Sequence, residues 1–468
     1  MNEKKDGIRD AKTLGLPKML ILGLQHMFAM FGATVLVPIL VAGYFNEACP
    51  DELTRGLTVS VTLFCAGFGT LIFHLCSKFK VPAFLGSSFA FLGGFYSVAN
   101  LTDGAYATMG ANEKAAYACG GIVIAGCLYF VLALIIRLVG VKRVMRFLPP
   151  VVTGPIIICI GLSLAGSAIN NASNNWLLAI IALATIIIFN IFGKGMFKII
   201  PILMGVVVSY LAAVIFTMVG ITNPDGSAIL NFAPIKDAAI AGLPAFQMAK
   251  FDITAILVMA PIAIASMMEH IGDMSAISAT VGENFISDPG LDHTLFGDGL
   301  ATAFSGFLGG PANTTYGENT GVLELSRVFD PLVIRLAAVF AIILSFIPKF
   351  SAVISTMPAS IIGGVSIMLY GMISAIGVRN VVENKVDLTQ SRNLVIAGVI
   401  FVCGLGFANG LTFTVGGTSI TLTALAIAAI AGIALNAILP GNDYEFGTNP
   451  AGDQSRGVYV GPSGKKNK

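Results

Sequence analysis

Acidic side chains stand inside apolar sequence at two places in the chain. Glu318 lies in the run TTYGENTG, and Glu269 lies near the end of the apolar run 256–273, with Asp273 four residues further on. A carboxylate in hydrocarbon is costly, so such groups face a cavity, find partners or carry a proton. Their chemistry is to accept hydrogen bonds from a ligand and to bind protons. The pattern therefore predicts a site for a small polar molecule and a cation.

Each of these acidic residues also has a purely structural interpretation. Glu269 and Asp273 share one helical face and could lie at a helix end among lipid headgroups. Glu318 could pair with an arginine or with backbone amides to pack the surrounding segments. The glycines beside Glu318 favour ligand binding, because glycine lets backbone amides approach a ligand closely. His26, which follows Gln25 in the first apolar run, is predicted to make a structural hydrogen bond.

A second polar stretch matches the one around Glu318. The runs VPAFLGSSFAF at 81–91 and PANTTYGENTGV at 311–322 begin about 230 residues apart, roughly half the chain. Irregular backbone at membrane depth is tolerated only where protein buries it or where it lines a cavity. Interrupted segments at matching places in two halves are typical of a transporter's binding site. Ser88 and Phe89 in the first run offer a hydroxyl and an aromatic ring, which suit a flat polar ligand.

The composition is that of a polytopic membrane protein. Of 468 residues, 56% are hydrophobic and only 11% are charged, which is too few charges to cover a soluble globule of this size. The seven cysteines and four histidines are scattered, so neither a disulfide framework nor a metal site is predicted. A net charge of +2 gives no electrostatic case for nucleic acid. The polar N-terminus lacks a cleavable signal pattern, so we expect the first hydrophobic segment to be retained.

Scanning for hydrophobic stretches about 20 residues long predicts fourteen segments. They lie near 18–42, 53–77, 82–99, 115–137, 148–168, 176–192, 199–219, 253–271, 293–310, 312–325, 331–347, 358–377, 391–407 and 419–439. Lysine and arginine gather in alternate loops and at both ends, which predicts cytoplasmic termini. The long loop 220–252 separates two halves of seven segments, and an odd number inverts the second half. The predicted fold is therefore all-α, with two inverted seven-segment repeats.

Several runs together resemble one transporter family. LQHMFAMFGATVLVP (24–38), EHIGD (269–273), DPGLDHTLFGDGLAT (288–302), IIGGVSIMLYGMI (361–373) and the two polar stretches are similar to bacterial uracil permeases of the nucleobase/ascorbate transporter (nucleobase–cation symporter) family. The similarity extends over nearly all of the predicted segments and is most specific in the tenth. There, residues 318–327 fit the family signature, with Ser326 where threonine is usual.

The resemblance implies a division into two domains. A core domain would comprise residues 1–147 and 253–350, and a gate domain residues 148–252 and 351–440, followed by a cytoplasmic tail at 441–468. It also implies short antiparallel β-strands in the third and tenth segments that meet at the binding site. Family members often form homodimers through the gate domain, and a homodimer is expected here by that analogy.

The resemblance also implies roles for particular residues. Glu269 and Glu318 would accept the two ring N–H groups of uracil, while the backbone amides of Phe89 and Gly317 would donate to its carbonyl oxygens. Ala33 would lie nearby, and Ser88 would belong to the same site. The chain has Asp273 where the best-known uracil members have histidine, and aspartate occurs there in purine-transporting relatives.

These expectations combine into a proton-coupled uracil importer of the plasma (inner) membrane. Protonation would neutralise Glu269, shared with Asp273, and alternating access would follow. H⁺ is the expected coupling ion, Na⁺ is an open alternative, and no cofactor is expected. The closest alternative is a symporter for xanthine, urate or another purine. An anion exchanger or channel is disfavoured by the two acidic groups. No enzyme activity is expected, because Glu269-His270 does not form the HExxH motif of a metalloprotease.

Overall fold

The computed structural model describes residues 7–441 except 53, 55, 103, 408, 409, 416 and 417. The predicted tail beyond residue 441 lies outside this part of the chain. The first half contains α1 (Leu16–Ala48), α2 (Val59–Cys76), β1 (Leu85–Ser87), α3 (Leu92–Ala99), α4 (Ala111–Val139), α5 (Val141–Met145), α6 (Pro150–Ser163), α7 (Ala165–Ser173), α8 (Trp176–Phe192), α9 (Met196–Ile199), α10 (Pro201–Val219) and α11 (Ala233–Asp237). Short 3-10 turns precede α1 at Ala11–Leu14 (η1), α3 at Phe89–Phe91 (η2) and α4 at Gly104–Ala107 (η3).

The second half continues with α12 (Ile253–Met259), η4 (Ala260–Ile262), α13 (Ala263–Val281), η5 (Ile286–Gly290), α14 (Leu291–Phe307), β2 (Asn313–Thr315), α15 (Gly317–Ser326), α16 (Pro331–Ser345), α17 (Pro348–Ser355), α18 (Ala359–Glu383), α19 (Ser391–Gly406), β3 (Leu411–Val415), β4 (Thr418–Leu422) and α20 (Ala424–Ile438). Each of the fourteen predicted segments contains a helix. Among the described residues, seven helices are long and apolar enough to cross a membrane, or eight if the bent pair α16–α17 is one span. The full number of crossings stays a prediction.

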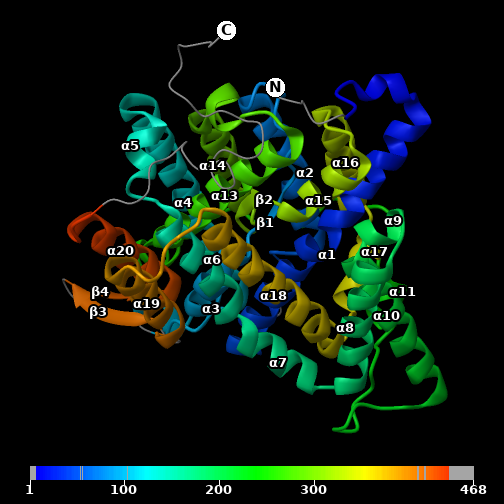
Figure 1. The fold of residues 1–468 in the computed structure, drawn as a ribbon. Helices are drawn as coiled ribbons and strands as arrows, with labels where there is room; N and C mark the ends of the chain where they lie inside the picture. The colour runs from blue at the N-terminus through cyan, green and yellow to red at the C-terminus, as the bar shows by residue number, and fades with distance from the viewer. Residues whose placement is uncertain are drawn as a thin grey trace.

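The helices pack into two groups. In the first, which we call the strand bundle, α1–α4 pack with α12–α16 around β1 and β2, and the strands lie at the centre of the molecule (Figure 1). In the second, which we call the second bundle, α6–α8 and α10 pack with α18–α20. Small residues allow close helix approach within both. A Cβ on Gly126 of α4 would lie 2.6 Å from the Gly299 carbonyl oxygen of α14, and one on Gly161 of α6 would lie 2.2 Å from the Tyr370 carbonyl oxygen of α18.

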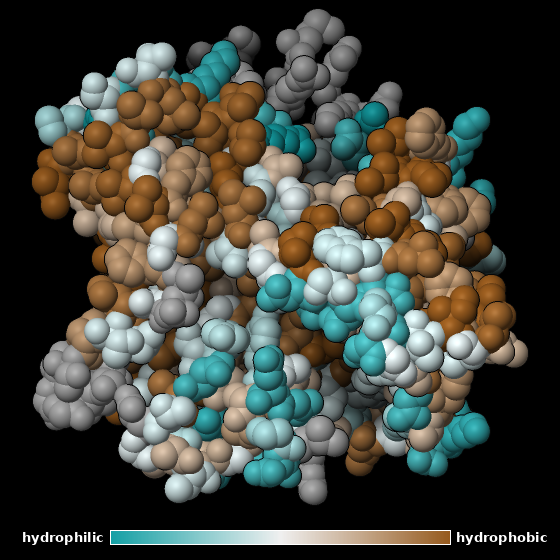
Figure 2. Space-filling model, turned by 90° about the horizontal axis from the view of Figure 1, so that it is seen from below, coloured by the Kyte–Doolittle hydropathy of each residue, from teal (hydrophilic) through white to brown (hydrophobic). Residues whose placement is uncertain are grey.

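The surface has the distribution expected of a membrane protein. Seen from below, hydrophobic residues form large areas at the upper left and at the right, and more polar residues lie between them and over the lower part (Figure 2). Exposed large hydrophobic residues are frequent on helices of both bundles, including Leu134 and Leu138 on α4 and Ile215 and Met218 on α10. In water such helices would expose large apolar patches, whereas lipid tails solvate them.

The connection from α11 to α12 is bound to the strand bundle along residues 247–250. The backbone amides of Gln247 and Ala249 donate to carbonyls at the end of α14, and the Lys250 amide donates to the Ala116 carbonyl oxygen of α4 at 3.0 Å. A Cβ on Gly120 would lie only 1.8 Å from the Lys250 carbonyl oxygen, so the close contact requires glycine. This part of the connection is therefore fixed to the strand bundle, although it precedes the predicted start of the core domain's second part.

Candidate functional site

Strands from the two halves of the chain pair at the centre of the strand bundle. β1 and β2 are antiparallel, with Leu85 opposite Thr315, Gly86 opposite Thr314 and Ser87 opposite Asn313. The ladder extends beyond the strands, because the Ser88 amide donates to the Ala312 carbonyl oxygen at 2.8 Å. Both strands are buried and lie in the third and tenth predicted segments. Pairing satisfies the extended backbone where no water is present to do so.

Gly86 lets the two strands and α1 approach one another. A Cβ at Gly86 would lie 2.4 Å from the ring of Tyr316 and 2.7 Å from the hydroxyl of Thr34. The hydroxyl of Tyr316 in turn donates to the Ser87 carbonyl oxygen at 2.8 Å. The aromatic ring thus fills the space that a side chain on β1 would occupy. A larger residue at position 86 would displace the ring or separate the strands.

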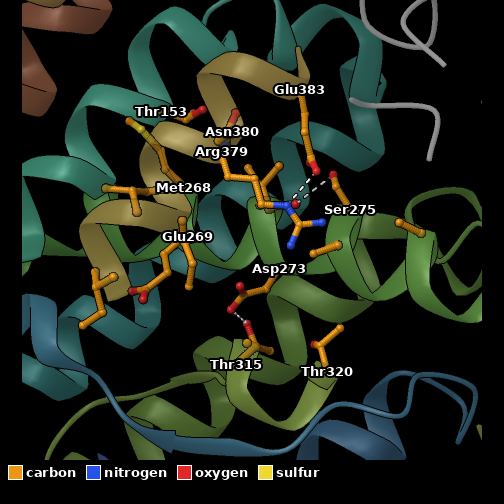
Figure 3. Close-up of a pocket in the computed structure, with 18 of the residues that line it drawn as sticks. Thr153, Met268, Glu269, Asp273, Ser275, Thr315, Thr320, Arg379, Asn380 and Glu383 are labelled. Atoms are coloured by element: carbon orange, nitrogen blue, oxygen red, sulfur yellow. Dashed lines mark hydrogen bonds and ion pairs between the residues drawn. The ribbon is translucent and has the colours of Figure 1, made fainter. Parts of the chain in front are cut away.

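A cavity of about 610 Å³ lies between the strand bundle and the second bundle. One wall comes from α13, β2 and α15, and the opposite wall comes from α6 and α18 (Figure 3). Thr153 and Ile157 are lining residues on α6, and Ile373, Arg379 and Asn380 are lining residues on α18. A cavity with a wall from each of two packed groups can change shape when one group moves against the other.

Two of the predicted acidic residues line this cavity. Glu269 and Asp273 lie one turn apart on α13, which continues to Val281, so neither stands at the helix end. Asp273 is only 8% exposed, and its carboxylate accepts a hydrogen bond of 2.7 Å from the Thr315 hydroxyl of β2 (Figure 3). This bond fixes α13 to β2 beside the cavity.

The other predicted site residues are distributed around the same strands. Phe89 and Gly317 line the cavity, and Gly317 is the first residue of α15. Ser88 is fully buried, with its hydroxyl 3.4 Å from that of Ser266, and it is not a lining residue. Ala33 is buried within α1 and is not a lining residue either. Glu318 is the second residue of α15, and its side chain lies outside the described part of the structure.

The predicted structural hydrogen bond of His26 is present. The side-chain amide of Asn319 donates to the His26 carbonyl oxygen at 3.1 Å and lies 3.4 Å from the ring nitrogen Nδ1. Both residues are buried, and Asn319 directly follows Glu318 in α15. The contact therefore fastens the first turn of α15 to α1. It fixes the backbone at Gly317 and Glu318, where the sequence predicts ligand contacts.

Comparison with known proteins shows the family to which the chain belongs. The model of a family described as the Permease family matches residues 17–413. The chain belongs to this family. It is 40% identical to the uracil permease of Bacillus caldolyticus, with 94% of this chain and 96% of that protein covered. It is 37% identical to the putative pyrimidine permease RutG of Escherichia coli, with 90% and 89% covered. The chain is a permease and not an enzyme.

Solved structures show the same fold at low sequence identity. SLC26A9 matches with a TM-score of 0.59 and 12% identity, covering 92% of this chain and 66% of that one. The transmembrane domain of the cyanobacterial bicarbonate transporter BicA matches with a TM-score of 0.54 and 17% identity, covering 82% and 96%. The predicted fold class, a polytopic helical membrane transporter, is confirmed.

The permease has a buried histidine–carboxylate contact that the sequence analysis missed. His270 Nδ1 of α13 lies 2.8 Å from Asp298 Oδ2 of α14, and both side chains are completely buried. Asp298 stands in the predicted ninth segment. An acidic residue inside an apolar run indicates a buried partner, so the sequence did contain a signal for this contact. His270 directly follows Glu269. The pair therefore fixes α13 to α14 on the side away from the cavity and orients the turn that carries Glu269.

A second missed group lies on the opposite wall. Arg379 Nε of α18 donates to Glu383 Oε1 at 2.6 Å, one turn along the same helix, and both residues line the cavity with Asn380 (Figure 3). Arg379 and Glu383 are well exposed, so the pair contributes little to stability. Facing it across the cavity, Thr320 and Glu324 of α15 complete a polar wall. The cavity is thus polar on both sides at this end.

Proposed function

We propose that this permease imports uracil by proton symport through alternating access. The observation that carries the proposal is one cavity that brings together Glu269, Asp273, Phe89 and Gly317 beside β2, the strand that pairs with β1. Uracil has two N–H donors and two carbonyl acceptors in one plane. Carboxylates suit the donors, and backbone amides suit the acceptors. Curated relatives that carry the name uracil permease support the same substrate.

The acidic pair on α13 supports coupling to protons. Glu269 and Asp273 lie one turn apart beside the same cavity, and Asp273 is nearly buried. Two neighbouring carboxyl groups bind protons as a coupled pair, so one proton can serve both. Adding that proton lowers the charge at the site before the strand bundle moves against the second bundle. A loaded, less charged site is easier to carry past hydrocarbon.

The decisive experiment is uptake of radiolabelled uracil into proteoliposomes with an imposed pH gradient, with and without sodium. We expect saturable uptake that needs the pH gradient and not sodium, and a near-complete loss for Glu269→Gln. The matched control is Glu113→Gln, which removes a carboxylate from an exposed ion pair with Lys250 far along the sequence from the cavity residues. Uptake equal to wild type in Glu269→Gln would remove this residue from the mechanism.

A purine symporter is the second candidate, and two observations favour it. Position 273 carries the aspartate found in purine-transporting relatives, and a 610 Å³ cavity lies within the size range of sites for molecules larger than one pyrimidine ring. Competition of labelled uracil by unlabelled xanthine or urate separates the two. Strong competition by a purine, stronger than by unlabelled uracil, would assign the permease to purines.

A further inference from the structure

The N-terminal segment is attached to the strand bundle by a regular backbone pattern. Ile8 forms a parallel bridge with Val328, in which the Ile8 amide donates to the Arg327 carbonyl oxygen and the Phe329 amide donates to the Ile8 carbonyl oxygen, both at 2.8 Å. The Ala11 amide donates to the carboxylate of Asp330, also at 2.8 Å. Ala11, Val328 and Val333 form a small hydrophobic cluster separate from the main core. Residues 8–11 are therefore held against the connection between α15 and α16.

Arg9 joins this connection to the end of α13. Its guanidinium forms an ion pair with Glu283, donates from Nη2 to the Val281 carbonyl oxygen at 2.9 Å and lies 5.8 Å from the centre of the Phe329 ring. Val281 is the last residue of α13, and Gly282 ends the helix in a left-handed conformation at φ 75°. A cation at this position satisfies a free carbonyl and interacts favourably with the helix dipole. A single side chain thus contacts both elements.

The two segments that Arg9 joins, α13 and the connection that follows α15, lie at the end of one wall of the cavity. Ala279 and Thr280 line it from the last turns of α13, and Gly321 and Glu324 line it from α15. The same two helices carry the predicted ligand groups, since α13 bears Glu269 and Asp273 and α15 begins at Gly317. The Asp273–Thr315 hydrogen bond holds the wall together at the strand end. The contacts of Arg9 hold it together at the far end.

We propose that Arg9 is a positioning residue for the substrate site. It sets the spacing between α13 and α15 at the cavity's far end. That spacing in turn sets the distance between the carboxylates on α13 and the backbone amide at Gly317. The uptake arm of the test rests on the proposed uracil transport, whereas the exchange arm does not. The position of a binding group decides affinity, so a loosened wall weakens substrate binding more than it slows turnover.

The test compares Arg9→Ala with Lys12→Ala, which removes an exposed cation one turn further along the same segment. Because the Arg9–Glu283 pair is partly exposed, we expect Arg9→Ala to raise the KM for uracil by about three- to tenfold at unchanged maximal rate. Lys12→Ala should leave both constants unchanged. Loss of folded protein would instead lower the maximal rate at constant KM. That result, or an unchanged KM, would overturn the proposal.

Two further measurements make the result specific to the pair. The double variant Arg9→Glu with Glu283→Arg should recover part of the lost affinity, because it restores the ion pair but not the donor to the Val281 carbonyl oxygen, while each single reversal should be at least as weak as Arg9→Ala. In purified permease without substrate, amide hydrogen exchange at 275–283 and 327–330 should quicken in Arg9→Ala. If exchange quickens in Arg9→Ala but the wild-type protein transports no uracil, the positioning role of Arg9 is supported and the proposed substrate is refuted. Unchanged exchange would refute the positioning role itself.

Discussion

The hydrogen bond between Thr315 and Asp273 allows the protonation of the site to be measured. The Thr315 hydroxyl, on a strand that is almost completely buried, donates to Asp273 Oδ2 at 2.7 Å. Thr315→Val removes the hydroxyl but keeps the branched shape, so it leaves no cavity. Thr315→Ser keeps the hydroxyl and is the matched control. The two variants separate the hydrogen bond from packing.

The size of the effect depends on the charge of Asp273. A hydrogen bond to an ionised group contributes about 1.5–3 kcal/mol, because the lost donor leaves a buried charge less well solvated. Hydrogen bonds between segments inside a membrane average about 0.6 kcal/mol. Thr315→Val should therefore lower the free energy of unfolding by about 2 kcal/mol where Asp273 is ionised. Where Asp273 is protonated, the loss should shrink to about 0.6 kcal/mol.

The assay is equilibrium unfolding of the purified permease in mixed micelles at a series of pH values. If Asp273 exchanges its proton during transport, the difference between wild type and Thr315→Val is large at high pH and falls as the pH drops. The pH at the midpoint of this change should match the midpoint of proton-driven uptake. A difference that stays constant across the pH range in which the same assay series finds proton-driven uptake to change would refute the assignment of Asp273 to proton coupling.

Three more outcomes are expected. Gly86→Ala should reduce substrate affinity by about five- to 150-fold, because forcing a methyl group into a filled space costs about 1–3 kcal/mol. Asp298→Ala should destabilise the permease by about 1–3 kcal/mol, since it leaves the buried ring nitrogen of His270 without its partner. Burial raises the pKa of Asp252, but hydrogen bonds, first that from Tyr106, outweigh it and lower the pKa. Tyr106→Phe should therefore cost up to about 1 kcal/mol at neutral pH, and the cost should shrink as the pH falls below the ordinary aspartate pKa near 4.

Each of these predictions has its own control. Gly93→Ala adds the same methyl group where no atom lies within 4 Å, and equal losses in the two variants would contradict the packing argument. Asp298→Asn keeps the shape of the buried side chain. A melting temperature as low as that of the alanine variant would contradict the predicted cost of leaving His270 without a partner. A Tyr106→Phe penalty that grows as the pH falls would have the wrong sign. A lowered folded-state pKa stabilises fully above the unfolded value near 4, and this stabilisation is lost as the pH falls below it.

The sequence predicted those features that depend on order along the chain. The two polar stretches indicated interrupted segments, and the structure has short strands followed by helices in both. The four-residue spacing of Glu269 and Asp273 placed them on one face of α13, where both line the cavity. Helical periodicity and the cost of polar backbone in lipid are local properties, so a single sequence carries them.

Contacts between distant segments could not be predicted in this way. The register of β1 on β2, the His270–Asp298 pair and the contacts of Arg9 with Val281 all join segments whose spacing along the chain says nothing of their distance in space. Arg9 was interpreted only as one of the charges that mark a cytoplasmic end. Its partner Glu283 lies beyond an apolar helix, and no local pattern relates the two.

The pairing of β1 with β2 has a consequence for how the permease is made. More than 200 residues separate the strands, so β1 leaves the ribosome long before its partner exists. During that interval the backbone amides and carbonyls of β1 have no partner strand, and leaving them without hydrogen bonds in hydrocarbon is energetically costly. Until β2 is made, the β1 segment therefore needs other hydrogen-bond partners, either in the insertion machinery or from water. A chain that ended before β2 would leave the polar backbone of β1 without its partner strand.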